Sequence, residues 1–124
     1  MELVDFFRGV IESSKSPIVI CDMDYRIVYI NSEADTFFKR QNKNITTGTS
    51  VRIYFNEETM SKINMSIEWF KEDINNNKVF SYHIDEGNQD VYIRAIRDDK
   101  KNLIGFFNYH EFRDPENGKQ YDVD

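Results

Sequence analysis

The sequence predicts an α+β domain in which helices cover one face of an antiparallel sheet. Three observations support this fold class. Two β-branched runs, Ile18–Cys21 and Ile27–Ile30, flank the polar turn Asp22–Arg26. A stripe of apolar residues with helical period occupies residues 56–74, and three segments with strand-like alternation follow it. The expected element order is therefore helix, two strands, a block of helices and three strands.

Composition sets limits on size and function. A chain of 124 residues is expected to fold as one domain with a core that needs no disulfides. Its net charge of −6 argues against a nucleic-acid surface, which needs a basic patch. The single cysteine, Cys21, fits a reducing compartment. Since the sequence has neither a long apolar run nor a secretory signal at its start, we expect a cytoplasmic protein that does not contact a membrane.

The first helix is expected over residues 2–14, where the apolar side chains exceed the needs of a short surface helix. These side chains are Leu3, Val4, Phe6, Phe7, Val10 and Ile11. Two interpretations are open. The helix either covers the sheet of its own chain or packs against the same helix of a second chain.

A short helix is expected after the hairpin, ending at Phe37–Phe38. Ser32, with Asp35 three residues later, is expected to be its N-cap. The polar residues 39–50 form a connector, and residues 51–55 form a helical turn.

The longest helix is expected to begin after Asn56, which suits an N-cap, and to run to about Ile74. Asn75–Asn77 would end it. Its apolar stripe consists of Met60, Ile63, Ile67, Phe70 and Ile74. This stripe is expected to face the sheet.

Residues 79–85, 91–97 and 103–112 are expected to form an antiparallel meander with short turns. In the first of these strands, alternation predicts that one face holds Phe80, Tyr82 and Ile84. The polar residues 113–124 are expected to form a loose tail.

The stretch from residue 16 to residue 38 resembles the start of a PAS domain. In that family a hydrophobic run, a D-x-x-G-x turn and a second hydrophobic run lead into N-x-x-A. The matching positions are held by Asp22, Asp24, Asn31 and Ala34, whereas Tyr25 replaces the common turn glycine. The resemblance covers residues 16–112 and implies a five-stranded antiparallel sheet with the order two, one, five, four, three.

The expected organisation is an N-terminal helix in residues 1–15, the PAS-like domain in residues 16–112 and a polar tail in residues 113–124. PAS domains often finish with a D-I-T-like element that passes the signal to a following helix. The nearest matches here, Glu111–Arg113 and Arg113–Pro115, depart from that pattern, and Pro115 would interrupt a continuing helix. The chain is either complete or one part of a larger sensor.

The family's cofactors can be tested against the residues. Light-oxygen-voltage domains carry G-x-N-C-R-F-L-Q, and the matching stretch Gly48–Phe55 has Val51 in place of the adduct-forming cysteine. Haem-binding relatives usually take a histidine from the long helix, and residues 57–74 contain none. We therefore expect no haem and no covalent flavin adduct. His83 and His110 lack an acidic cluster, so no metal site is expected either.

The resemblance implies a small-molecule pocket between the sheet and the long helix. The candidate lining residues are Ile53, Met60, Ile63, Ile67, Phe80, Tyr82, Ile93, Ala95, Phe107 and Tyr109. A shift of one residue in the last strand would replace Phe107 and Tyr109 by Phe106, Asn108 and His110. A tyrosine hydroxyl or Asn108 would orient the ligand. The alternative is that these side chains simply fill a core.

We therefore expect a noncatalytic sensory or signal-transduction module that binds a small ligand or a protein partner, as in bacterial regulation. The alternative is a structural dimerisation domain with a filled core. Cys21, in an apolar strand, is expected to be inert rather than nucleophilic. The assembly expected from the first helix is a homodimer, with a separate signalling protein as a further partner.

Overall fold

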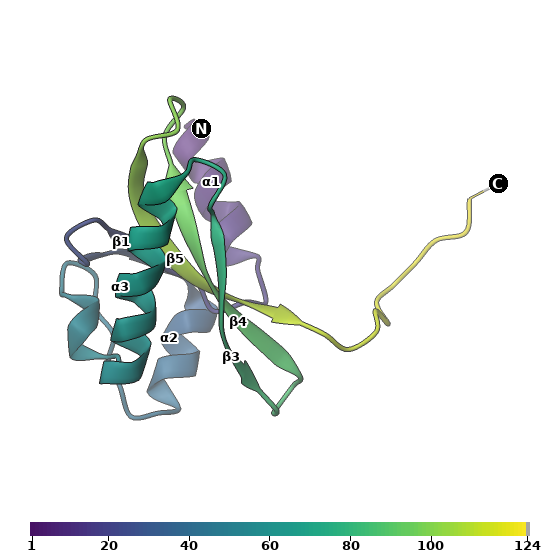
Figure 1. Cartoon of the computed structure of the whole chain (residues 1–124). Helices are drawn as coiled ribbons and strands as arrows, with labels where there is room; N and C mark the ends of the chain where they lie inside the picture. The colour runs from purple at the N-terminus through teal and green to yellow at the C-terminus, as the bar shows by residue number, and fades with distance from the viewer. Residues whose placement is uncertain (124) are drawn as a thin grey trace.

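The computed structural model describes residues 1–123, and Figure 1 shows how its elements are arranged. Within these residues a five-stranded antiparallel sheet has the order β2-β1-β5-β4-β3. The elements are α1 (Leu3–Glu12), β1 (Val19–Asp22), β2 (Ile27–Ile30), α2 (Ser32–Lys39), η1 (Val51–Ile53), α3 (Glu57–Glu72), β3 (Lys78–Ile84), β4 (Gln89–Arg97) and β5 (Leu103–Phe112). The predicted fold class and strand order are confirmed.

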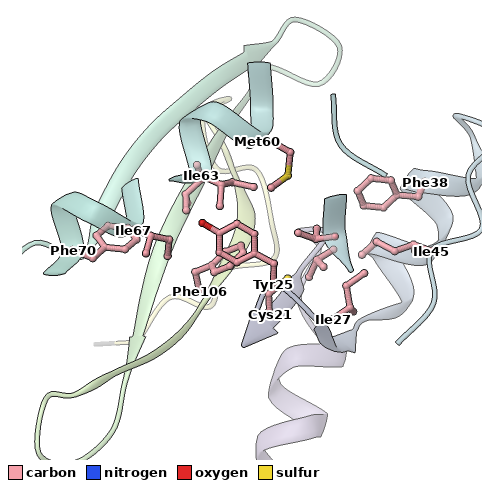
Figure 2. Packing of buried hydrophobic residues seen from close by; sticks show 14 residues of the cluster. Cys21, Tyr25, Ile27, Phe38, Ile45, Met60, Ile63, Ile67, Phe70 and Phe106 are labelled. Atoms are coloured by element: carbon pink, nitrogen blue, oxygen red, sulfur yellow. The ribbon is translucent and has the colours of Figure 1, made fainter. Parts of the chain in front are cut away.

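The core lies between the sheet and α3 (Figure 2). From the helical side it receives Ile63, Ile67 and Phe70, which are at most 3% exposed. Ile93 and Phe106 meet them from β4 and β5 and are fully buried. The predicted helical stripe therefore faces the sheet along most of its length.

The long helix ends two residues earlier than expected. Asp73 adopts an extended backbone and terminates α3 after Glu72. The side chain of Asn76 then donates a hydrogen bond of 2.8 Å to the carbonyl of Trp69, which the helix leaves free. Ile74 consequently lies outside the stripe and is 56% exposed.

Asn31, rather than Ser32, is the N-cap of α2. Its Oδ1 accepts hydrogen bonds of 2.9 Å from the backbone N–H groups of both Ala34 and Ile18. Its Nδ2 donates to the carbonyls of Ile11 and Ser16. The prediction missed this because the distant partners that bury the Asn31 side chain are not visible in a local pattern.

Tyr25 occupies the turn position where the PAS pattern has glycine, and it adopts a left-handed φ of 64°. This conformation is costly for a residue with a β-carbon. The ring packs edge-on against Phe106 at 5.4 Å, and the hydroxyl donates a 2.6 Å hydrogen bond to Oδ1 of Asn64. Burial of the ring and this hydrogen bond offset the strained backbone.

A bulge in β3 corrects the predicted alternation. The register with β4 shifts between Phe80 and Tyr82, which pair with Tyr92 and Val91 respectively. The extra residue, Ser81, turns Tyr82 toward the helical side and leaves Phe80 on the opposite face. Phe80 and Tyr82 therefore do not share a face.

Helix α1 does not cover the sheet with its apolar side chains. Figure 1 shows it behind the sheet, on the side away from α3. Among the described residues, the hydrogen bonds that tie α1 to the sheet lie near its C-terminal end. There Tyr29 donates a 2.5 Å hydrogen bond to Glu12. The side chains exposed by 54–69% are Leu3, Val4, Phe6, Phe7 and Val10. Of the described helices, none is long and apolar enough to cross a membrane.

Candidate functional site

A cavity of about 380 Å³ lies between the inner face of the sheet and the helices that cover it. Its sheet side is formed by β1, β3, β4 and β5, and its helical side by α2, the loop after it and the first turns of α3. The lining residues are Pro17, Val19, Phe37, Phe38, Gln41, Lys43, Tyr54, Phe55, Asn56, Glu58, Thr59, Lys62, Tyr82, Val91, Asn108 and His110. This volume is within the range of small-molecule sites.

Two polar side chains of β5 reach the cavity from the sheet. Asn108 and His110 are two residues apart and therefore point to the same face. The Oδ1 atom of Asn108 is buried and has no hydrogen-bond partner within the described residues. Such an atom is unusual, because nearly all buried polar groups are paired.

His110 is buried in its neutral form. Burial lowers the pKa of its imidazole to about 4. Its Nδ1 lies 2.8 Å from Oε1 of Gln89, whose Nε2 in turn donates to the carbonyl of Glu86. Because the Gln89 oxygen is an acceptor, Nδ1 of His110 carries the proton and Nε2 is left as an acceptor.

The helical side contributes two ammonium groups. Lys43 donates a 2.8 Å hydrogen bond to the carbonyl of Tyr54, and Lys62 donates a 2.6 Å hydrogen bond to the carbonyl of Ser81. Glu58 lies 3.7 Å from the Lys62 ammonium, at an exposed position. The backbone contacts hold both ammonium groups in place while each retains further N–H donors.

Aromatic rings form much of the apolar wall. Phe38 and Phe55 stack with their ring centres 5.9 Å apart, and Phe37 meets the His110 ring edge-on at 5.1 Å. The cavity thus combines a polar sheet side, an aromatic wall and a cationic helical side.

Comparison with known families identifies the architecture. The family description "PAS fold" matches residues 5–106. The chain belongs to the PAS family. A search of curated proteins found no match for it. Sequence resemblance had pointed to the same family from the hairpin and the N-x-x-A motif.

Solved structures, PAS domains among them, resemble the chain in fold. The PAS domain of a protein from Colwellia psychrerythraea has a TM-score of 0.63 at 14% identity, over 90% of this chain and 97% of that one. A C-terminal domain from Streptococcus mutans reaches 0.68 at 19% identity, over 88% and 84%. The PAS domain of histidine kinase ThkA reaches 0.54 at 18% identity, over 77% and 97%. At these identities the likeness shows the fold alone.

The residues predicted to line a pocket in this PAS domain divide into three groups. Tyr82 lines the cavity. A second group belongs to the core or packs against it, namely Met60, Ile63, Ile67, Ile93 and Ala95. The third group lies elsewhere: Ile53 is 69% exposed on η1, Phe80 is 54% exposed, and Phe107 and Tyr109 lie on the other face of the sheet.

The alternative register of β5 is the one that the structure has. Phe106 pairs with Ala95 in the core, and Asn108 and His110 come to the cavity. Sequence reasoning missed the contributions of α2 and the following loop, including Phe37 and Lys43. The polar composition of residues 39–50 indicates only a connector, and the one signal for this part of the site is the aromatic pair that precedes them.

The structure also shows the surroundings of the residues that bear on covalent flavin, metal binding and thiol chemistry. Val51, which replaces the photoadduct cysteine, is fully buried in η1. Among residues 1–123, no group of three His, Cys, Asp or Glu side chains is arranged to hold a metal ion. Burial raises the pKa of the Cys21 thiol to about 12, so the nucleophilic thiolate is suppressed.

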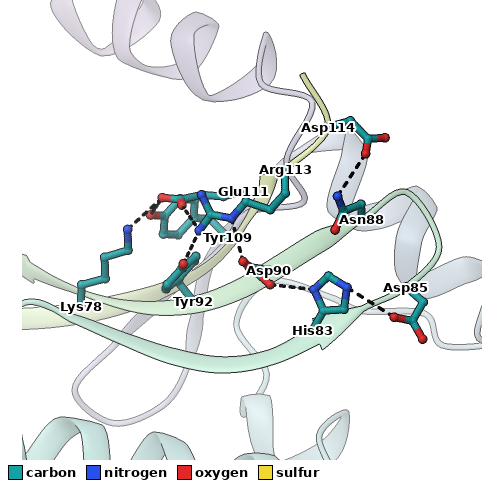
Figure 3. A network of polar contacts seen from close by, with 10 residues as sticks. All are labelled: Lys78, His83, Asp85, Asn88, Asp90, Tyr92, Tyr109, Glu111, Arg113 and Asp114. Atoms are coloured by element: carbon teal, nitrogen blue, oxygen red, sulfur yellow. Dashed lines mark hydrogen bonds and ion pairs between the residues drawn. The ribbon is translucent and has the colours of Figure 1, made fainter. Parts of the chain in front are cut away.

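The outer face of the sheet carries a separate polar network (Figure 3). Arg113 contacts Asp90 and Glu111 at 2.7 Å each and also contacts the hydroxyl of Tyr92. Hydrogen bonds from Arg113 and His83 lower the pKa of the Asp90 carboxyl. Since Arg113 follows β5 directly, this network links the start of the C-terminal segment to Asp90 and Tyr92 of β4.

Proposed function

We propose that this PAS domain is a noncatalytic sensory module that binds a small molecule in the cavity between the sheet and α3. The observation that carries the proposal is the buried, unpartnered Oδ1 of Asn108 beside a cavity of about 380 Å³. Because this oxygen has no accessible surface in the structure, the Asn108 side chain would turn it toward the cavity to accept a hydrogen bond from a bound molecule. Two structural neighbours, the PAS domain of histidine kinase ThkA and a sensory box sensor histidine kinase from Vibrio cholerae, support a role in signal transduction. The single cysteine fits a location in the reducing cytoplasm.

The proposal includes a route for the signal. A ligand that contacts Asn108 and His110 acts on β5, and Arg113 at the end of that strand is held to β4 through Asp90. A change in the β5 backbone would therefore alter the exit of the C-terminal segment. In this proposal the contacts of Arg113 with Asp90, Glu111 and Tyr92 switch between two states. When they are formed they hold the C-terminal segment, and when they break they release it.

We propose further that the domain functions as a homodimer through α1. Five apolar side chains of this helix are 54–69% exposed, and contiguous apolar patches of this kind are uncommon on monomers. A symmetric pair of α1 helices would bury the same patch on both copies. A separate signalling protein is the other partner that this surface suits.

The alternative function is a structural dimerisation domain with no ligand. The exposed face of α1 favours dimerisation under both hypotheses, so only occupancy of the cavity distinguishes them. We propose that the occupant is neither haem nor a covalently attached flavin, because Val51 and the residues of α3 lack the required cysteine and histidine.

Native mass spectrometry of the protein as purified tests these proposals together. We expect a dimer that carries a noncovalent small molecule, which is lost on denaturation. A dimer without added mass would support the structural alternative, and a monomer at tens of micromolar would contradict the role of α1. Phe7→Glu should produce monomers, whereas Ile53→Glu, at an exposed position on η1, should leave the dimer intact.

A further inference from the structure

We propose that the cavity binds a small planar molecule with an amide-like edge, in which a hydrogen-bond donor and an acceptor occupy adjacent positions. Lactams, primary amides and nucleobases have such an edge. This inference rests on the proposed small-molecule function and adds the chemical class of the ligand.

Asn108 has hydrogen-bonding capacity that the protein does not use. Its Oδ1 is buried without a partner in residues 1–123, and a buried acceptor of this kind destabilises the empty protein. A carboxamide presents its NH₂ donors directly beside its oxygen. We infer that the side chain turns its amide toward the cavity, and the ligand that then pairs with both groups has a donor next to an acceptor, as in the bidentate pairing of asparagine with adenine.

His110 presents its Nε2 atom to the ligand as a hydrogen-bond acceptor. Its Nδ1 donates to Gln89, so the Nε2 atom of a ring that lines the cavity is left as an acceptor. Residues two apart on one strand are about 7 Å apart. A second donor on the ligand, at a distance suited to a substituted ring or a bicycle, would reach His110 while the amide-like edge meets Asn108.

Shape and charge also restrict the ligand. The stacked pair Phe38 and Phe55 offers a flat aromatic surface, which favours a planar ligand. The ammonium groups of Lys43 and Lys62 are held on the helical side, where they disfavour a cation, and Glu58 offsets only the second. The cavity of about 380 Å³ has the volume of roughly a dozen water molecules, which suits one or two fused rings.

Isothermal titration calorimetry with defined probes tests the inference. Adenine, uracil and benzamide have the proposed edge, toluene has a planar ring without it, and benzylamine has a ring with a positive charge. We expect at least one edge-bearing probe to bind 10-fold or more tightly than toluene, and benzylamine to bind weakest. The expected ratio corresponds to one well-formed pair of hydrogen bonds.

Asn108→Leu supplies the decisive variant, because it keeps a similar volume and removes the amide. We expect it to weaken the edge-bearing probes by about 10-fold or more and to leave toluene unaffected. Asn117→Leu, the same exchange in the exposed C-terminal segment, should change neither. Thermal melting should show Asn108→Leu to be at least as stable as the unmodified chain, because the exchange removes an unpaired buried oxygen.

The outcomes of these experiments separate the chemical class of the ligand from the question of whether the cavity binds small molecules at all. If toluene binds as well as the edge-bearing probes, and Asn108→Leu has no effect, the chemical class is wrong while the cavity still binds ligands. If none of the five probes binds at millimolar concentration, both the class and the proposed small-molecule function fail. A marked loss of stability in Asn108→Leu would show that the side chain has a structural role, and this would also overturn the inference.

Discussion

Substitution of Ile67 by alanine tests whether the α3 stripe is filled core or cavity wall. Ile67 is 3% exposed, lies in the cluster with Phe70 and Phe106, and does not line the cavity. Removal of its three outer carbon groups costs about 2.4 kcal/mol in transfer free energy. The hole left in a packed core adds about 1–2 kcal/mol, so we expect a total near 3–4 kcal/mol.

The assay is urea unfolding monitored by circular dichroism, with the midpoint converted to a free energy of unfolding. Ile74→Ala is the matched control, because Ile74 continues the sequence stripe but is 56% exposed. Its loss should be below about 0.5 kcal/mol. Equal losses at the two positions would refute the assignment of the helix end at Glu72, and a loss below about 1 kcal/mol at Ile67 would show that the site is not packed core.

Two further predictions concern β5. Gly105→Ala should destabilise the protein strongly, because a Cβ there would lie 2.2 Å from the carbonyl oxygen of Cys21, whereas Gly9→Ala, with open space around it, should stabilise α1 by about 1 kcal/mol. Thermal melts compare the two. The pKa of His110 is about 4 in the folded chain, below the ordinary value of 6.5. Its contribution to stability is therefore complete above pH 6.5 and is lost as the pH falls toward 4, by up to about 3 kcal/mol. Urea melts at several pH values should show that the free energy of unfolding depends less on pH in His110→Gln than in the unmodified chain, and an equal pH dependence would contradict a buried neutral His110.

The features that the sequence predicted well are those with strong local or repeated signals. The hairpin of β1 and β2 has β-branched runs on both sides of an Asx turn, and the stripe of α3 repeats at helical spacing over several turns. The element order then left one familiar topology. These signals do not depend on which distant residues pack together, so the elements they predict are present in the folded chain.

Local pattern is a weaker guide to the candidate site, because the site depends on which face of the sheet each strand residue points to and on contacts between distant residues. A bulge at Ser81 reverses the side-chain direction in β3, and pairing of Phe106 with Ala95 sets the face of Asn108. Neither follows from alternation within one strand. Lys43 reaches the cavity from a loop that has no periodic pattern, so its position could be found only from the tertiary structure.

The contrast between α1 and the rest of the chain also has a physical reason. Excess apolar residues in residues 2–14 predicted that the helix must be covered, and the pattern left open whether by its own sheet or by a second chain. The structure leaves Phe7 59% exposed and Val10 69% exposed. The structure of a single chain does not show whether a second chain covers them, so the dimer through α1 stays a proposal.

The central claim, that the cavity binds a small molecule, is tested most directly by protein-detected NMR with a library of planar fragments. We expect bound fragments to shift the amide signals of Asn108, His110 and Tyr82, three residues that line the cavity from β3 and β5. These shifts should saturate with concentration. The absence of saturable shifts at these positions for every fragment, or binding confined to the exposed face of α1, would show that the cavity is not a small-molecule site.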